Sequence, residues 1–160
     1  MRVSRNALAS RNINEPSLFA VRLAFTLKIG VQQLIHPFAE HIGLVVESQE
    51  DGQSRCSITV CETHLNPHGV VHGAVICALA DNGMGAALYP SLQPGQLCAT
   101  IEIKINYYRP VKSGLLRCDT VVVNRGKRIA NLEASIFRDA VLVAKANGNY
   151  SIFTPSGDRT

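Results

Sequence analysis

Apolar side chains recur at helical spacing in three stretches of the chain. These stretches are residues 16–35, 37–42 and 73–88. Pro16 suits the first turn of a helix, and Gly43 suits the end of the second one. The third stretch, GAVICALADNGMGAAL, is apolar around almost its whole circumference, which predicts a buried helix. Its Gly83 and Gly85 each cost about 1 kcal/mol of helix propensity relative to Ala, so we expect another element to approach closely there.

Six further stretches alternate between apolar and polar residues, which is typical of strands with one buried face. They cover residues 44–49, 55–61, 97–107, 115–124, 129–137 and 142–153. The joints at 124–126 and 138–139 are short, and short joints connect antiparallel neighbours. We therefore expect the last four strands to form an antiparallel meander. A curved sheet that wraps around the buried helix is an α+β architecture.

Composition limits the class of protein. A chain of 160 residues with 46% hydrophobic and 18% charged residues suits one globular domain. It has no apolar run of about 18 residues, so stable membrane insertion is not expected. Five cysteines without a CxxC pair indicate reduced thiols in a cytoplasmic protein and no metal site.

The net charge of +4 is concentrated near the N-terminus, where the first 40 residues carry five basic and two acidic side chains. No dense basic cluster with interleaved aromatic residues occurs, and nucleic acid is not expected as a partner. The first twelve residues are rich in Arg, Ser and Asn and lack acids. This composition suits a mitochondrial transit peptide and a loose bacterial N-terminus equally well.

The candidate catalytic residues lie in the predicted helix 73–88 and at its start. Asp81 stands in its otherwise apolar middle, where a carboxylate needs hydrogen-bond donors or a wet cleft. His72 and Gly73 lie where a loop becomes the helix, and the free N–H groups and dipole of a helix start can hold an oxyanion. Taken alone, each residue has a structural explanation: a satisfied Asp, a capping His and a Gly in a turn.

The spacing adds a geometric constraint. His72 and Asp81 are nine residues apart, which on one helix means roughly 13 Å and opposite faces. They could act on one bond only if two antiparallel helices met across a two-fold axis. Within one copy of the chain, the two residues therefore cannot serve the same bond.

Two segments carry a family resemblance. The run NPHGVVHGAVICALADNGMG, residues 66–85, resembles the signature of hot-dog-fold thioesterases of the phenylacetate-pathway type, and IEIKINYYRPV resembles the strand that follows. The likeness extends over about 37–153. It implies a hot-dog domain at 37–160. Residues 1–36 lie outside the likeness, and the helical spacing within them predicts a helical extension. The likeness also implies a homo-oligomer (a dimer or a dimer of dimers) that hydrolyses acyl-CoA or aryl-CoA thioesters with no cofactor beyond the CoA of the substrate.

The resemblance also implies roles for single residues. The Gly73 N–H, assisted by Asn66, would polarise the thioester carbonyl. Asp81 of the partner copy would activate water or attack directly, His72 would help to shape the site, and Thr100 would position the water. Ala74 departs from the family, which often has a second Gly there.

Four further residues are candidates for substrate binding, and ordinary surface positions are the alternative for each of them. His68 could line the site, and three basic residues could meet the phosphates of CoA. The three are Arg109, Lys127 and Arg128.

Other functions stay open at this stage. One is a non-catalytic acyl-CoA-binding module or sensor, whose basic N-terminal segment would contact DNA or a membrane. A hot-dog hydratase is a third reading, but the Asp and His spacing expected of that branch is absent. No GxGxxG, Walker-type or GxSxG motif is present, which argues against nucleotide-dependent and serine-hydrolase chemistry.

Overall fold

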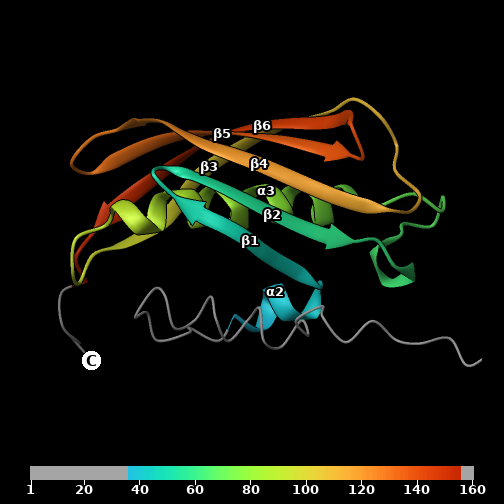
Figure 1. The fold of residues 1–160 in the computed structure, drawn as a ribbon, viewed down its shortest axis with the longest axis horizontal. Helices are drawn as coiled ribbons and strands as arrows, with labels where there is room; N and C mark the ends of the chain where they lie inside the picture. Colours follow the sequence, from blue (N-terminus) through green and yellow to red (C-terminus); the bar gives the residue numbers. More distant parts are fainter. Residues whose placement is uncertain (1–35, 156–160) are drawn as a thin grey trace, which may run out of the picture. The chain divides into compact units, whose positions relative to one another are not determined.

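The computed structural model describes residues 36–155 of the chain (Figure 1). The predicted helix at 16–35 lies outside the described residues, as does nearly all of the predicted extension at 1–36. The described elements are α2 (Pro37–His41), β1 (Leu44–Glu50), β2 (Gln53–Thr59), α3 (Gly73–Leu88), β3 (Leu97–Tyr107), β4 (Leu115–Arg125), β5 (Ile129–Arg138) and β6 (Val141–Phe153). Two short 3-10 turns, Glu62–His64 and Tyr89–Ser91, flank α3. Within the described residues, the predicted helices and strands are thus present, with β2 shifted by two residues toward the N-terminus.

The six strands form one antiparallel sheet in the order β1-β2-β4-β5-β6-β3. The predicted meander is therefore correct for β4, β5 and β6 but wrong for β3, which pairs with β6 at the edge of the sheet. Residues 108–114 connect β3 to β4. They begin beside β6 and end beside the residue that follows β2. The Tyr108 N–H still donates to Val143 O, whereas Gly114 O already accepts from Val60 N–H. Alternation along a strand does not specify which strand lies beside it, because pairing depends on where the connections lead.

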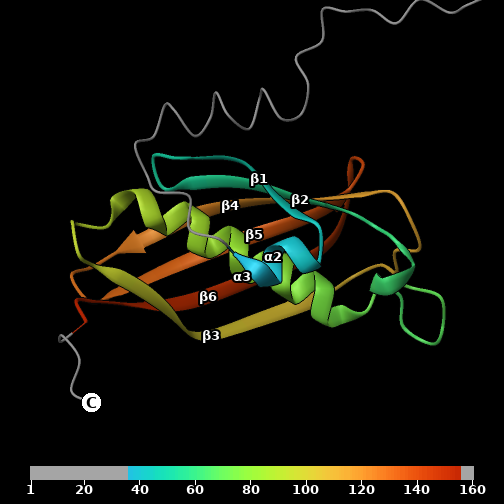
Figure 2. The same ribbon diagram turned by 90° about the horizontal axis from the view of Figure 1, so that it is seen from below.

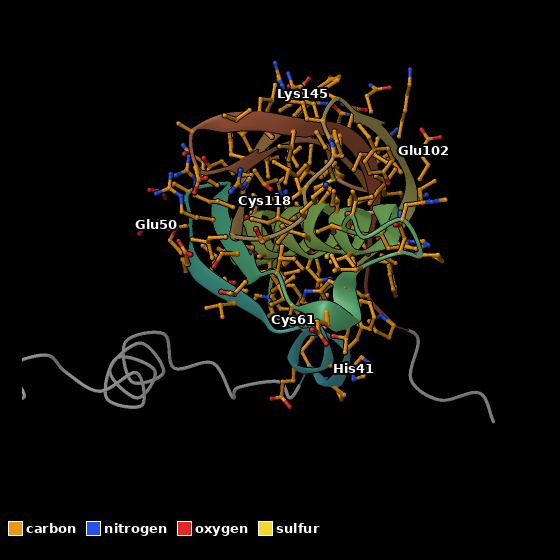
Figure 3. The ribbon with its side chains drawn as sticks, turned by 90° about the vertical axis from the view of Figure 1, so that its right-hand side faces the viewer. His41, Glu50, Cys61, Glu102, Cys118 and Lys145 are labelled. Atoms are coloured by element: carbon orange, nitrogen blue, oxygen red, sulfur yellow. The ribbon has the colours of Figure 1, made fainter. Side chains whose placement is uncertain are left out.

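The sheet curves around α3. Figure 3 shows this curvature from the end, with Glu50, Lys145 and Glu102 pointing outward from the sheet. The inward residues of β4 and β5 are the alternating apolar set that the sequence predicts. They are Leu116, Cys118, Ala130, Leu132, Ala134 and Ile136, all within 1% of full burial.

The helix α3 lies across the concave face of the sheet, and α2 lies on the side of α3 away from β5 and β6 (Figure 2). Leu79 and Met84 of α3 are completely buried against the sheet. The expectation that α3 is covered on nearly every side is only partly right. Ala74 is exposed, and Asp81 and Gly85 are half-buried.

The two glycines of α3 differ in their surroundings. A Cβ on Gly83 would lie 2.8 Å from Thr120 Oγ1, and Gly83 O accepts a hydrogen bond from Ser54 Oγ at 2.8 Å. Gly83 thus permits the predicted close approach of the sheet. Gly85 has no atom within 4 Å of such a Cβ, so the same prediction is wrong there. In the part of the chain that the structure describes, no helix has the length and hydropathy to cross a membrane.

Candidate active site

Asp81 lies in the middle of α3 and is held by two hydroxyl groups. Thr100 Oγ1 donates to Asp81 Oδ1 at 2.7 Å, and the Tyr150 hydroxyl donates to the same Oδ1 at 2.5 Å. The Tyr150 hydroxyl is also 3.0 Å from the main-chain oxygen of Asp81. Within residues 36–155, no group donates to Asp81 Oδ2. One carboxylate oxygen is therefore anchored and the other is available to a further partner.

Thr100 reaches Asp81 because β3 contains a bulge. The pairing of β3 with β6 shifts its register between Thr100 and Glu102, so Ile101 is the extra residue. Strict alternation would put Thr100 and Ile103 on opposite faces of the sheet, whereas the bulge brings both to the concave side. Ile101 is 56% exposed. The sequence correctly places Thr100 opposite Ile101, but it does not reveal that this face meets Asp81.

Tyr150 is a site residue that the sequence analysis missed. It lies on the inner face of β6 and is 2% exposed. Burial, together with its hydrogen bond to the Asp81 carboxylate, raises the pKa of Tyr150 far above its ordinary value, so the phenol stays protonated and donates. The available signal was a tyrosine on a strand face otherwise made of Ala, Gly and Ile, since a buried hydroxyl needs a partner.

Asp81 and Thr100 line a groove of about 280 Å³. Its other lining residues are Phe38, Ala74, Cys77, Ala78 and Ile103. The groove is therefore mostly apolar, with one carboxylate and one hydroxyl. Burial, with a smaller contribution from the charge of Asp81, raises the pKa of the Cys77 thiol. This thiol is thus a poor nucleophile at neutral pH.

The start of α3 has a different construction. His72 is the N-cap residue, and its Nδ1 accepts a hydrogen bond from the Ala74 N–H at 3.0 Å. The Tyr107 hydroxyl donates to Gly73 O at 3.0 Å, and a Cβ on Gly73 would lie 3.2 Å from Tyr107 Cζ. Gly73 is thus the residue that lets this aromatic ring pack against the first turn. Its own N–H has no acceptor among the described residues.

The loop before α3 is organised by Asn66 and His64. Asn66 Oδ1 accepts from the His68 N–H at 2.9 Å, and Asn66 O accepts from the Gly69 N–H at 2.9 Å. The amide of Asn66 therefore shapes the loop, while His68 is exposed. His64, which the sequence analysis did not single out, is 5% exposed, and its main-chain oxygen accepts from the His72 N–H at 2.8 Å. It ties the loop to the helix start.

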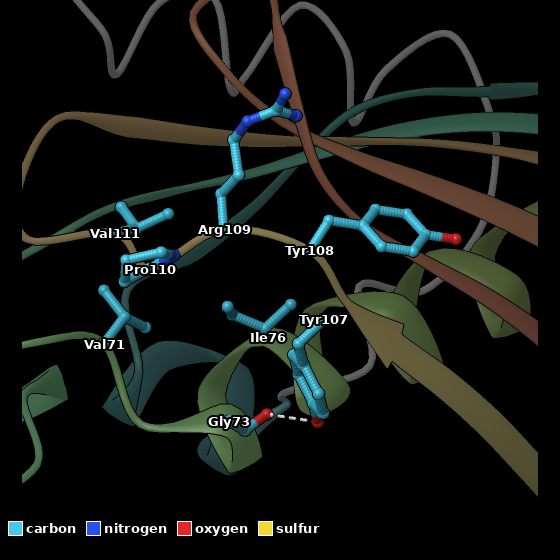
Figure 4. Close-up of a pocket in the computed structure, with 8 residues that line it drawn as sticks. All are labelled: Val71, Gly73, Ile76, Tyr107, Tyr108, Arg109, Pro110 and Val111. Carbon is cyan, nitrogen blue, oxygen red and sulfur yellow. Dashed lines mark hydrogen bonds between the residues drawn. The ribbon is translucent and has the colours of Figure 1, made fainter.

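A second groove, of about 260 Å³, lies beside Gly73 (Figure 4). It is lined by Val71, Gly73, Ile76, Tyr107, Tyr108, Arg109, Pro110 and Val111. Arg109 Nη1 donates to Leu142 O at 3.0 Å, so the guanidinium is partly engaged by the main chain. This groove and the Asp81 groove share no lining residue.

The structure does not bring Gly73 and Asp81 together within one chain. Eight helical residues separate them by about 12 Å. The helical geometry assumed for His72 and Asp81 does not apply, because His72 has an extended backbone and precedes the helix. Gly73 O and the Asp81 carboxylate both contact side chains of β3. Their separation therefore runs along β3, from Tyr107 to Thr100.

The three candidate phosphate-binding residues also lie apart. Arg109 follows the C-terminal end of β3, whereas Lys127 and Arg128 form an exposed turn near its N-terminal end. Arg128 O accepts from the Ile152 N–H, and Ile152 pairs with Cys98 of β3. The described residues contain no cluster of three or more His, Cys, Asp or Glu side chains that could hold a metal ion.

Comparison with known proteins places the chain among enzymes of one family. The family model described as the thioesterase superfamily matches residues 68–145. A Pseudomonas aeruginosa protein whose name describes it as a candidate esterase is 30% identical over 60% of this chain and 72% of its own length. The 1,4-dihydroxy-2-naphthoyl-CoA hydrolase of Listeria monocytogenes is 27% identical over 55% of this chain and 72% of its own length.

Solved structures agree with this result. A variant of the phenylacetic acid degradation protein of Thermus thermophilus superposes with a TM-score of 0.68. It is 27% identical, and the match covers 72% of this chain and 98% of that protein. The fold is therefore shared with proteins of this type.

Proposed function

Because the chain belongs to the thioesterase superfamily and has its hot-dog fold, we propose that it hydrolyses acyl-CoA or aryl-CoA thioesters with Asp81 as the catalytic carboxylate. One observation carries this proposal. Asp81 lines an apolar groove with one oxygen held by two hydroxyls and the other without a donor among the described residues. The name of the Listeria relative, which specifies hydrolysis of an aromatic CoA thioester, supports the substrate class.

In the proposed reaction, Asp81 Oδ2 takes a proton from a water molecule as that water attacks the thioester carbonyl. Carboxylates are ionised at neutral pH, as a general base must be. The negative charge that develops on the carbonyl oxygen is stabilised by the Gly73 N–H and the positive end of the helix dipole. The C–S bond then breaks, Asp81 returns its proton to the departing CoA thiolate, and the products are the free acid and CoA. Thr100 positions the carboxylate and the water.

Direct attack by Asp81 Oδ2 is the other chemical route, and it would form a mixed anhydride. A single turnover in ¹⁸O-labelled water separates direct attack by water from an anhydride that water opens at the aspartyl carbon. Attack by water puts the label into the acid product. Attack by the carboxylate leaves the label in Asp81 in the first turnover, when water opens the anhydride at the aspartyl carbon.

We further propose that each site is built from two copies of the chain. A thioester and its attacking water span only about 3 Å, whereas Gly73 and Asp81 of one helix are about 12 Å apart. The edge strand β3 is eleven residues long and exposes Leu97, Ile101 and Tyr107. Such an edge is available for pairing with a second copy. The assembly would be a dimer or a dimer of dimers.

The remaining residues would support this chemistry. His72 Nδ1 accepts from the main chain, so the proton of a neutral ring lies on Nε2, where it can orient the substrate. Asn66 shapes the loop beside Gly73. His68, Arg109, Lys127 and Arg128 would bind the CoA portion, with the separated basic groups contributed by different copies.

The direct experiment is a hydrolysis assay on the full chain. Acetyl-, octanoyl-, palmitoyl- and benzoyl-CoA are tested while the released thiol is followed colorimetrically. Release of CoA from at least one class supports the proposal. Binding of acyl-CoA by calorimetry without any release would instead identify a non-catalytic binding module.

Mixed dimers test the shared site. Asp81→Asn and Gly73→Ala subunits are unfolded together and refolded as a mixture. If each site combines Gly73 of one copy with Asp81 of the other, every mixed dimer regains one intact site. Random pairing then restores about a quarter of the wild-type activity. No recovery, with mixed dimers demonstrated by native mass spectrometry, would contradict the shared arrangement.

A further inference from the structure

We propose that Tyr150 is a positioning residue: its hydroxyl holds Asp81 Oδ1 so that Oδ2 is presented to water. This inference rests on the proposed function of Asp81 and adds to it a residue from a distant strand. Tyr150 and Asp81 are 69 positions apart in the chain. No local motif connects them.

The position of Tyr150 is fixed from several sides. On β6 it pairs with Thr100 of β3 and with Ala130 of β5. The preceding inward residue, Gly148, lies against α3, since a Cβ there would be 2.7 Å from Met84 Sδ. This close packing brings β6 near the helix, and the 2% exposed phenol can then reach the helix backbone.

The Tyr150 hydroxyl donates preferentially to the carboxylate of Asp81. Tyr150 has one proton to donate, and two acceptors of Asp81 lie within reach, Oδ1 at 2.5 Å and the main-chain oxygen at 3.0 Å. The shorter contact is to Oδ1, which is the stronger acceptor because it is charged. The main-chain contact keeps the phenol next to the same residue. One hydroxyl thus contacts both the main chain and the carboxylate of Asp81.

Two donors on one oxygen restrict the carboxylate more than either donor does alone. Thr100 comes from β3 and Tyr150 from β6, so Oδ1 is held from two strands. Because the two oxygens of a carboxylate are rigidly linked, fixing Oδ1 also fixes the direction of Oδ2. Burial keeps the phenol protonated, so this anchor does not change over the pH range in which a carboxylate titrates.

Tyr150→Phe is the test, because it removes the hydroxyl and retains the ring that fills the core. We expect kcat to fall about tenfold to hundredfold, as for a catalytic group displaced by a fraction of an ångström, with KM within about twofold. We also expect the acid limb of the kcat/KM profile to move to higher pH, because the charged carboxylate loses a hydrogen bond. A purely structural hydroxyl would lower the melting temperature without moving that limb.

Tyr89→Phe is the matched control. Tyr89 stands at the C-cap of α3, and its hydroxyl has no hydrogen-bond partner among the described residues. The same change there should leave kcat and the pH profile at their wild-type values. Should Tyr150→Phe fail to fold, 3-fluorotyrosine incorporated at position 150 keeps the ring and is a stronger donor. The acid limb should then move to lower pH.

The outcomes separate this inference from the proposed function. If Asp81→Asn is inactive while Tyr150→Phe keeps the wild-type kcat and acid limb, the positioning role is overturned and the function stands. If Asp81→Asn is fully active, the proposed function itself is overturned. Crystal structures give a readout that does not need turnover. The inference requires both hydroxyls on one Asp81 oxygen in the wild type and a changed Asp81 rotamer in Tyr150→Phe.

Discussion

The two halves of the candidate site are built in opposite ways. The Asp81 centre is made of side chains, with hydroxyls of β3 and β6 converging on one carboxylate oxygen. The start of α3 is made of main chain: the Gly73 N–H has no acceptor among the described residues, beside the capping His72 and a tyrosine ring that a Cβ on Gly73 would approach to 3.2 Å. A side-chain centre can titrate and transfer protons, whereas a main-chain centre supplies a fixed field. In the proposed mechanism, the Asp81 centre would therefore transfer the proton and the start of α3 would stabilise the developing charge.

Asp81→Asn breaks the first half and should have the largest effect. The amide preserves the shape of the side chain but cannot accept a proton, so kcat should fall by about 10³-fold. Steady-state hydrolysis of the best CoA thioester measures the loss. Asp139→Asn is the control, since Asp139 lies in an exposed turn at φ 54°, a conformation that Asn tolerates. Full activity of Asp81→Asn would contradict the proposed proton transfer by Asp81.

Gly73→Ala breaks the second half. Its Cβ would press on Tyr107 at 3.2 Å and displace the first turn, so we expect a loss of about tenfold to hundredfold in kcat. The matched control is Gly85→Ala in the same helix, where nothing lies within 4 Å. That change should leave kcat unaltered and stabilise the fold by up to about 1 kcal/mol, measured by urea unfolding. Equal losses from both substitutions would mean that the helix, rather than its start, is the sensitive feature.

Alkaline pH should lower the free energy of unfolding more through Tyr150 than through Tyr107. The pKa of Tyr150 is raised above its ordinary value of 10.0, mainly by burial. Below about pH 10 both folded and unfolded chains keep this proton, and its contribution to stability is complete. Above that pH only the unfolded chain loses the proton, so the free energy of unfolding falls by up to about 1.4 kcal/mol per pH unit.

Unfolding by urea between about pH 9 and 11 measures this slope. Tyr150→Phe should make it shallower. Tyr107→Phe should change it less, because Tyr107 is half-exposed and burial, which raises its pKa, is far less complete there than at Tyr150. Identical slopes in the wild type and Tyr150→Phe would contradict the assignment of a strongly raised pKa to the buried phenol.

The smallest effects are expected from the basic residues. Alanine at Arg109, at Lys127 or at Arg128 should each raise KM about two- to fivefold, because exposed charge pairs contribute less than about 1 kcal/mol. The increase should shrink in about 0.5 M salt, which screens the phosphates of CoA. Lys145→Ala removes an exposed pair with Glu133 on the outer face and serves as the control. A KM that responds equally to all four changes would indicate only a general charge effect.

Much of the fold could be read from the chain itself. The period of two located every strand to within two residues at its start, and the period of the apolar run located α3 at residues 73–88. The isolated carboxylate in that run pointed to Asp81, and the surrounding signature pointed to the family. These features are local, because each residue's own polarity reports which face it presents.

The tertiary structure decided the rest. It placed β3 beside β6, turned Thr100 inward through the bulge at Ile101, and brought Tyr150 to Asp81. None of these has a local pattern. Each depends on the register between segments that are distant in sequence, and that register is set when the connections close and the core packs. The sequence by itself determined which residues could do chemistry, and the packing determined which of them meet.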